Sequence, residues 1–179
     1  MNCQLNIACR TLVGAALWLS GCALMAPQQA DLCANTDWYE IGRQDGAKGL
    51  SEDQLELRLR SCVPNQRERV AQLYLTGRNV GLVDYCSPTN AFNLGRNGQA
   101  YTQVCPHPME RDFLREYRRG QRVFELEQAN RQLDQRIGSL SQELERALPQ
   151  DSRNELADQI NELRQTRQVN ERELRGLTR

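Results

Sequence analysis

Two runs of apolar residues with heptad spacing, separated by a proline, constrain the second half of the chain most strongly. The first run places apolar or amide residues at positions a and d of successive heptads, namely Val123, Leu126, Asn130, Leu133, Ile137, Leu140, Leu144 and Ala147. The second run follows Pro149 and comprises Leu156, Ile160, Leu163, Arg167, Asn170, Leu174 and Leu177. Proline lacks a backbone N–H, and its ring clashes with the preceding helical turn. The sequence therefore predicts two helices with a turn near residues 149–151.

Folding the chain back about residue 150 brings the two apolar runs into register. Leu140 then faces Ile160, Asn130 faces Asn170, and each position a meets a position d, as an antiparallel coiled coil requires. Residues 123–179 are therefore expected to form an antiparallel helical hairpin. The competing interpretation is a parallel dimer through residues 123–147, which would leave the second run without a partner.

The start of the second helix carries a local signal of its own. The segment SRNE at 152–155 matches a capping box, in which Ser152 and Glu155 each bond the backbone N–H at the other's position. This pattern predicts that the helix begins at Ser152.

A short apolar segment near the N-terminus is typical of an export signal. Arg10 precedes TLVGAALWLSGC, whose apolar part is about ten residues long. A membrane-spanning helix needs about 20 such residues, whereas the apolar region of a secretory signal needs only about 7–15. The segment is therefore expected to direct export rather than to span a membrane.

The end of this segment, Leu19-Ser20-Gly21-Cys22, resembles the lipobox of bacterial lipoproteins. In that family the signal peptide is cut just before the cysteine, and the cysteine is acylated. The resemblance implies a signal peptide at 1–21, palmitate or another acyl chain on Cys22, and a lipidated linker at 22–32. Ala23 resembles the pattern that sorts lipoproteins to the outer membrane, so we expect a location on its periplasmic face.

The remaining cysteines agree with an oxidising compartment. Of the seven cysteines, two lie in the predicted signal peptide and one is the predicted lipid site. Four cysteines remain, and an even number in an exported chain predicts two disulfides. These four are Cys33, Cys62, Cys86 and Cys105.

The pairing of these cysteines is limited by a predicted helix. The segment between Cys62 and Cys86 has a helical pattern, and such a helix separates its ends by about 30 Å. A disulfide needs the two Cα atoms within about 7 Å, so a Cys62–Cys86 bridge is not expected. Two schemes remain. We prefer Cys33–Cys62 with Cys86–Cys105 over the scheme that joins Cys33 to Cys86 and Cys62 to Cys105.

Residues 33–122 carry a repeated pair in which an aromatic residue stands three positions before a glycine. The four pairs are Tyr39/Gly42, Tyr74/Gly77, Phe92/Gly95 and Tyr117/Gly120. Positions i and i+3 share a helix face, and a glycine inside a helix costs about 1 kcal/mol relative to alanine. Its recurrence therefore indicates a packing requirement, and we expect a small helical domain with close helix contacts.

Polar residues beside these glycines allow a second interpretation. Arginine and asparagine side chains can hold the sugars and carboxylates of a cell wall. The candidate binding face consists of Arg43, Arg78, Asn79, Arg96 and Asn97.

Four segments of this region stand out, namely DWYEIGRQDGAKG, YLTGRNVGLVDYC, NLGRNGQAYTQVC and FLREYRRG. Together, over about residues 38 to 120, they resemble an uncharacterised family of Gram-negative envelope lipoproteins, the domain of unknown function 2799. This resemblance implies a small envelope domain and supports export. It implies no activity, because none is assigned to that family.

No pattern in the sequence indicates an enzyme. The chain has no G-x-S-x-G, H-E-x-x-H or phosphate-binding loop, and a carboxylate pair such as Glu40 and Asp45 arises readily by chance. With a single histidine and no C-x-x-C, neither a metal site nor a cofactor is expected. Lys and Arg total 23 against 23 Asp and Glu, so no net field attracts nucleic acid.

These observations predict an all-α, disulfide-stapled lipoprotein that ends in an antiparallel coiled-coil hairpin. Its expected role is structural or interaction-based at the cell envelope, with an envelope protein or peptidoglycan as partner. Peptidoglycan or wall-glycan binding through the Arg/Asn face is the alternative.

Overall fold

The computed structural model describes residues 33–146 and 149–179, so the predicted signal peptide, Cys22 and the linker lie outside the described residues. Within the described ranges the secondary structure is helical, as expected, and contains no strand. The helices are α2 (Trp38–Ala47), α3 (Asp53–Leu59), α4 (Pro64–Tyr85), α5 (Pro88–Arg96), α6 (His107–Leu144) and α7 (Gln150–Leu177). No described helix is long and apolar enough to cross a membrane.

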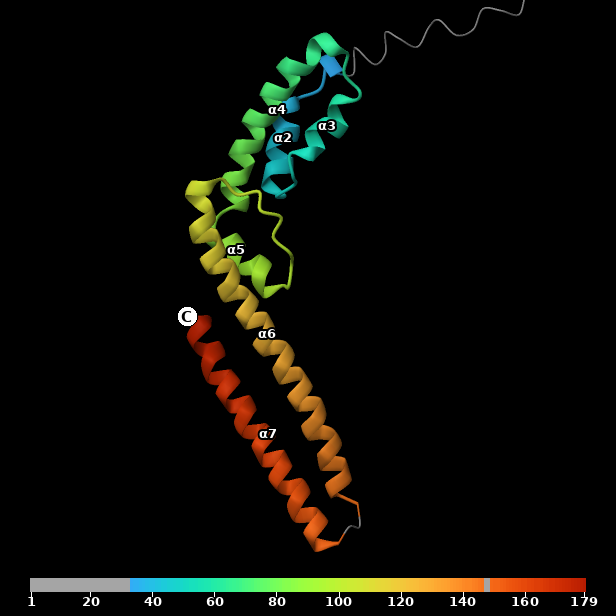
Figure 1. The fold of residues 1–179 in the computed structure, drawn as a ribbon, viewed down its shortest axis with the longest axis vertical. Helices are drawn as coiled ribbons and strands as arrows, with labels where there is room; N and C mark the ends of the chain where they lie inside the picture. Colours follow the sequence, from blue (N-terminus) through green and yellow to red (C-terminus); the bar gives the residue numbers. More distant parts are fainter. Residues whose placement is uncertain (1–32, 147–148) are drawn as a thin grey trace, which may run out of the picture.

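The molecule is a rod (Figure 1). Helices α2, α3 and α4 gather at one end, α5 packs against the first part of α6 in the middle, and the α6–α7 hairpin forms the other end. Helix α6 runs without a break from His107 to Leu144, so it passes through the predicted domain boundary between residues 122 and 123.

The preferred disulfide scheme is confirmed. Cys33 is bonded to Cys62 and Cys86 to Cys105, with Cα–Cα distances of 5.3 and 5.7 Å. Helix α4 fills most of the segment between Cys62 and Cys86, which is the reason that these two cysteines are not joined.

Helices α2 and α4 pack in parallel with their backbones in contact. Gly42 faces Tyr74 and Gly46 faces Arg78, so residue numbers rise together along the two helices. A Cβ atom on Gly42 would overlap the carbonyl oxygen of Tyr74, and one on Gly77 would overlap that of Tyr39. Only glycine permits this approach, which confirms that the repeated glycines serve helix packing.

Helices α5 and α6 repeat this arrangement. A Cβ atom on Gly95 would overlap the carbonyl oxygen of Tyr117, and one on Gly120 would overlap that of Phe92. A further glycine follows the first helix of each pair, three residues after Gly46 in α2 and three residues after Gly95 in α5. It has a positive φ of 67° and lies against an aromatic ring of the second helix. These contacts are Gly49 with Tyr85 in the first pair and Gly98 with Phe124 in the second.

The two disulfides occupy equivalent places in the two helix pairs. Cys33 and Cys62 lie 13 and 19 residues before Gly46 and Gly81, the last contact glycines of the first pair. Cys86 and Cys105 lie 9 and 15 residues before Gly95 and Gly120. Each cysteine-to-glycine separation is four residues shorter in the second pair than in the first, which is about one helical turn. The second pair is therefore the first pair with one turn removed from each helix.

The C-terminal hairpin has the predicted register. The side-chain amide of Asn170 donates a hydrogen bond of 2.9 Å to Oδ1 of Asn130, and Leu140 and Ile160 are both buried. The second apolar run thus pairs with the first within one chain.

The capping-box prediction was wrong. Helix α7 begins at Gln150 with Pro149 as its N-cap, so Ser152 already lies in the first turn and does not cap the helix. Proline is suited to this end of a helix, because the first N–H groups have no intrahelical partner and its φ of −56° is already helical.

Candidate functional site

A buried carboxylate holds α3 against the first helix pair. Asp45 on α2 is 2% exposed and accepts two hydrogen bonds of 2.8 Å from Nε and Nη2 of Arg58 on α3. The hydroxyl of Tyr74 on α4 donates a third, also of 2.8 Å. Burial, followed by this bond to Asp45, raises the pKa of Tyr74 to about 12. With its carboxylate enclosed in this way, Asp45 is not placed for acid–base chemistry on a ligand.

Arg78, a residue of the predicted binding face, points into the interior. It is 4% exposed, and its Nη2 donates a 2.9 Å hydrogen bond to the carbonyl oxygen of Leu50. Its Nη1 lies 3.6 Å from a carboxylate oxygen of Glu52. Tyr117 takes the equivalent place in the second pair, where its hydroxyl donates to the carbonyl oxygen of Gln99. Arg78 therefore closes the turn after α2, and an exposed binding face cannot include its guanidinium.

The other members of that face are accessible but lie on three elements. Arg43 on α2 makes two hydrogen bonds of 2.7 Å to the carboxylate of Glu40, and these hold the pKa of Glu40 at about 2. Arg96 on α5 lies 3.3 Å from Glu127 on α6. Asn79 on α4 and Asn97 at the C-cap of α5 are exposed. A ligand that binds Arg43 or Arg96 would have to compete with the carboxylate of Glu40 or Glu127. A binding face made of Arg43, Asn79, Arg96 and Asn97 stays a prediction.

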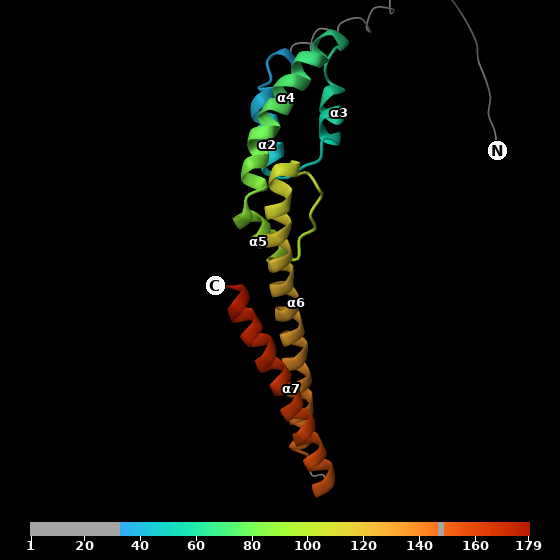
Figure 2. The same cartoon turned by 60° about the vertical axis from the view of Figure 1, so that its left-hand side comes forward.

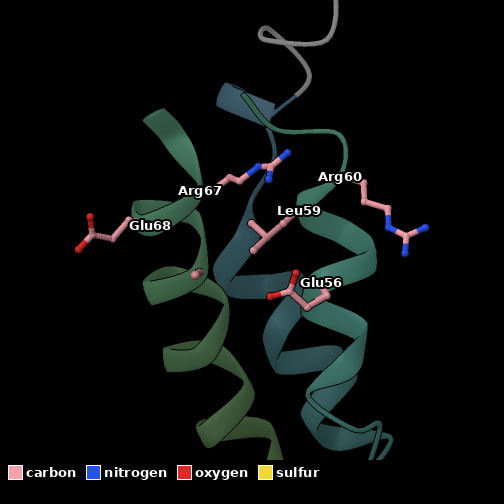
Figure 3. Close-up of a pocket in the computed structure, with 6 residues that line it drawn as sticks. Glu56, Leu59, Arg60, Arg67 and Glu68 are labelled. Carbon is pink, nitrogen blue, oxygen red and sulfur yellow. The ribbon is translucent and has the colours of Figure 1, made fainter. Parts of the chain in front are cut away.

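A shallow groove of about 390 Å³ lies between α3 and α4 (Figure 3). Its apolar lining comes from Leu59 and Ala71, and Figure 3 shows the side chains of Leu59 and Glu56 directed between the two helices. Arg60 and Glu68 point away from the groove. Small-molecule sites bring a few polar groups together on one point. Here Arg60 and Glu68 diverge, and Nε of Arg67 is already bonded to the carbonyl oxygen of Cys62. The groove therefore offers no built ligand site.

The described residues contain no group of three or more His, Cys, Asp or Glu side chains arranged to hold a metal ion.

The outer face of α4 is apolar and exposed. Leu73, Val80 and Val83 are 41%, 47% and 56% exposed, and Thr76 is also exposed. We call Leu73, Thr76, Val80 and Val83 the α4 stripe. Sequence reasoning missed it, although a signal was present, because residues 70–83 contain one charged side chain, Arg78, and that side chain is buried.

Residues 37–122 match the model of a family described as protein of unknown function, DUF2799. These residues form a DUF2799 domain. No curated protein and no solved structure matches the chain. The DUF2799 domain contains both glycine-packed helix pairs, the buried Asp45 cluster and the α4 stripe. It ends within α6, one residue before the heptad run begins at Val123.

Proposed function

We propose that the chain is a lipid-anchored protein of the periplasmic face of the outer membrane, where it has a structural or protein-interaction role. In this proposal Cys22 carries the lipid, and the rod holds its hairpin away from the bilayer.

The observation that carries the proposal is the placement of the two ends of the rod. Helices α2, α3 and α4 gather at one end of the rod, whereas the end of α6 and the start of α7 lie at the other end (Figures 1 and 2). At 1.5 Å per residue, α4 is about 33 Å long and α6 about 57 Å. The two helices follow one another along the rod, so an anchor before Cys33 would leave the hairpin turn about 90 Å away. Two disulfides in a domain of this size also support an oxidising compartment.

The anchor is tested by Cys22→Ala in cells fed labelled palmitate. We expect an unprocessed precursor without label. The matched control is Cys9→Ala, which removes another cysteine of the same segment and should leave processing and labelling unchanged. A Cys22→Ala protein of mature size that still carries the label would contradict the assignment.

A second experiment separates this role from wall binding. If the DUF2799 domain binds wall glycans, purified sacculi should retain the protein, and Arg43→Ala with Arg96→Ala should release it. Retention that is unaffected by these changes would remove the Arg/Asn face from consideration.

A further inference from the structure

The α4 stripe is an apolar helix face that no described element covers. Helix α4 packs mainly against α2 and to a smaller extent against α3 and α5, yet three large apolar side chains of the stripe are about half exposed. Helices that are apolar on all sides are normally buried, whereas a helix at the surface carries charges on its outer face. The hairpin helices follow the second pattern, with a narrow apolar seam and charges elsewhere. Within residues 33–146 and 149–179, the DUF2799 domain is therefore the part that leaves an apolar helix face uncovered.

The spacing of the stripe identifies the shape of its partner. Its residues are three, four and three positions apart, which is the spacing of a coiled-coil seam. The hydroxyl of Thr76 donates to the backbone carbonyl of Gln72 at 2.7 Å, so its polar group is already bonded within the helix. The stripe therefore suits another helix with an apolar seam.

We propose that the α4 stripe packs in parallel against the α4 stripe of a second copy of this chain when both copies are tethered to one bilayer. The proposal rests on the proposed function for the tether. In parallel pairing each residue of the stripe meets the same residue of the other copy. The flanking residues Gln72 and Asn79 have neutral amide side chains, so no like charges oppose the approach along the seam. Arg69 and Asp84 lie beyond its ends, where their side chains reach water.

The size of the stripe explains the need for a tether. From residue 73 to residue 83 the seam is about 15 Å long, and a stable complex in solution buries about 800 Å² per partner. A contact this short gives weak association between free molecules. Two copies held in one bilayer meet at a much higher effective concentration, so a weak contact suffices.

The tether also selects the direction of pairing. Antiparallel pairing would bring Arg69 of each copy toward Asp84 of the other, but it would point the two N-terminal ends in opposite directions. In parallel pairing both copies begin at the same end. Linkers of about ten residues, which span at most about 36 Å, can then reach the same bilayer.

The test uses residues 23–179 with an N-terminal histidine tag, bound to vesicles that contain a nickel-chelating lipid. This tether replaces the native lipid, so the outcome does not depend on whether Cys22 is acylated, and failure of the two proposals can be told apart. A photo-crosslinking amino acid at position 72 should give an adduct of dimer size on vesicles. We expect Val80→Glu to reduce this adduct at least fivefold.

The matched control is Val169→Glu on the hairpin, because Val169 is 51% exposed and Val80 is 47% exposed. This variant should leave the adduct unchanged. The thermal midpoint of each variant is measured beside that of the wild type, and Leu73→Gln serves as a second stripe variant should Val80→Glu fail to fold. Peptide mapping should join residue 72 to residues 69–77 of the other copy. Absence of the adduct, insensitivity to the stripe variants, or a crosslink to residues 80–88 would overturn the proposal.

Discussion

The molecule contains two kinds of helix pair, and they solve the same packing problem in opposite ways. Within the DUF2799 domain, α2 with α4 and α5 with α6 run in parallel and touch through their backbones at glycines. In the hairpin, α6 and α7 are antiparallel and touch through side chains of the heptad seam. Gly138 and Gly176 in the hairpin have nothing within 4 Å of an added Cβ. The same residue type is therefore indispensable in one region and incidental in the other.

The direction of the helices also explains where the disulfides lie. The antiparallel helices α6 and α7 are close in sequence, since α6 ends at Leu144 and α7 begins at Gln150, and no disulfide joins them in the described residues. Parallel helices require a longer connection, and each parallel pair has one, at residues 48–63 and 97–106. Each disulfide closes the open end of its pair, where the two helices begin. The covalent links thus follow from the parallel packing.

The largest difference between the regions is expected on reduction of both disulfides. Each bridge joins cysteines 29 or 19 residues apart and is worth about 3 kcal/mol, so about 6 kcal/mol is lost from residues 33–122. Residues 123–179 contain no cysteine and should keep their helicity. Trp38, whose indole N–H donates to the carbonyl oxygen of Cys33, reports on the domain by fluorescence, and far-UV circular dichroism reports on all helices. Equal loss of both signals in reductant would contradict the comparison.

A single methyl group should have opposite effects in the two regions. Gly77→Ala places a Cβ on the carbonyl oxygen of Tyr39, and forcing the helices apart should cost about 3 kcal/mol. Gly138→Ala meets open space and should gain about 0.5–1 kcal/mol through helix propensity. Urea unfolding followed at Trp38 and by circular dichroism measures both. If Gly77→Ala were as well tolerated as Gly138→Ala, the helices would not be in backbone contact.

High pH should weaken the DUF2799 domain alone. The unfolded chain releases the Tyr74 proton near pH 10, whereas burial raises the folded pKa to about 12, so the folded state binds more protons in between. Stability therefore falls as the pH rises above 10, by about 1 kcal/mol at pH 11 from Tyr74. Residues 123–179 contain no Tyr, Lys, Cys or His, so the hairpin has no side chain that titrates there.

Urea unfolding at pH 9 and pH 11 measures this effect. Tyr74→Phe should reduce the loss, and a remainder is expected because burial also raises the pKa of Tyr85 and Tyr101. An equal loss in the wild type and the variant would show that Tyr74 is not the source.

The smallest effect concerns the polar layer of the hairpin. Asn130→Leu leaves the amide of Asn170 without its partner and should lose stability or gain little. Changing both residues to leucine should raise the melting temperature and loosen the register. In the wild type any slip of the seam breaks the hydrogen bond between the two side-chain amides, and the double variant lacks this constraint. In a double-mutant cycle the two sites should couple by more than about 0.5 kcal/mol. Strict additivity would mean that the amides do not interact in solution.

Features that depend on spacing along one helix, or on the reach of a loop, followed from the sequence alone. The heptad run and Pro149 predicted the hairpin and its Asn130–Asn170 layer, because an antiparallel register is set by distance from the turn. The length of the helix between Cys62 and Cys86 limited the disulfide pairing. The N-cap of α7 was wrong by three residues, because Pro149 itself occupies the position that was assigned to Ser152.

Features that depend on which side of a helix is covered were decided only by the tertiary structure. Arg43 and Arg78 occupy the same place in two copies of Y-x-x-G-R-x-x-G, so the sequence assigned both to one binding face. The two sides of the α2–α4 pair are not equivalent, because α3 and the turn before it cover the side that contains Asp45, Tyr74 and Arg78. Arg78 is therefore buried, while the side chain of Arg43 reaches solvent and the side chains of the α4 stripe are exposed. Periodicity shows that a helix has faces, but the partner of each face is set by contacts between segments far apart in the chain.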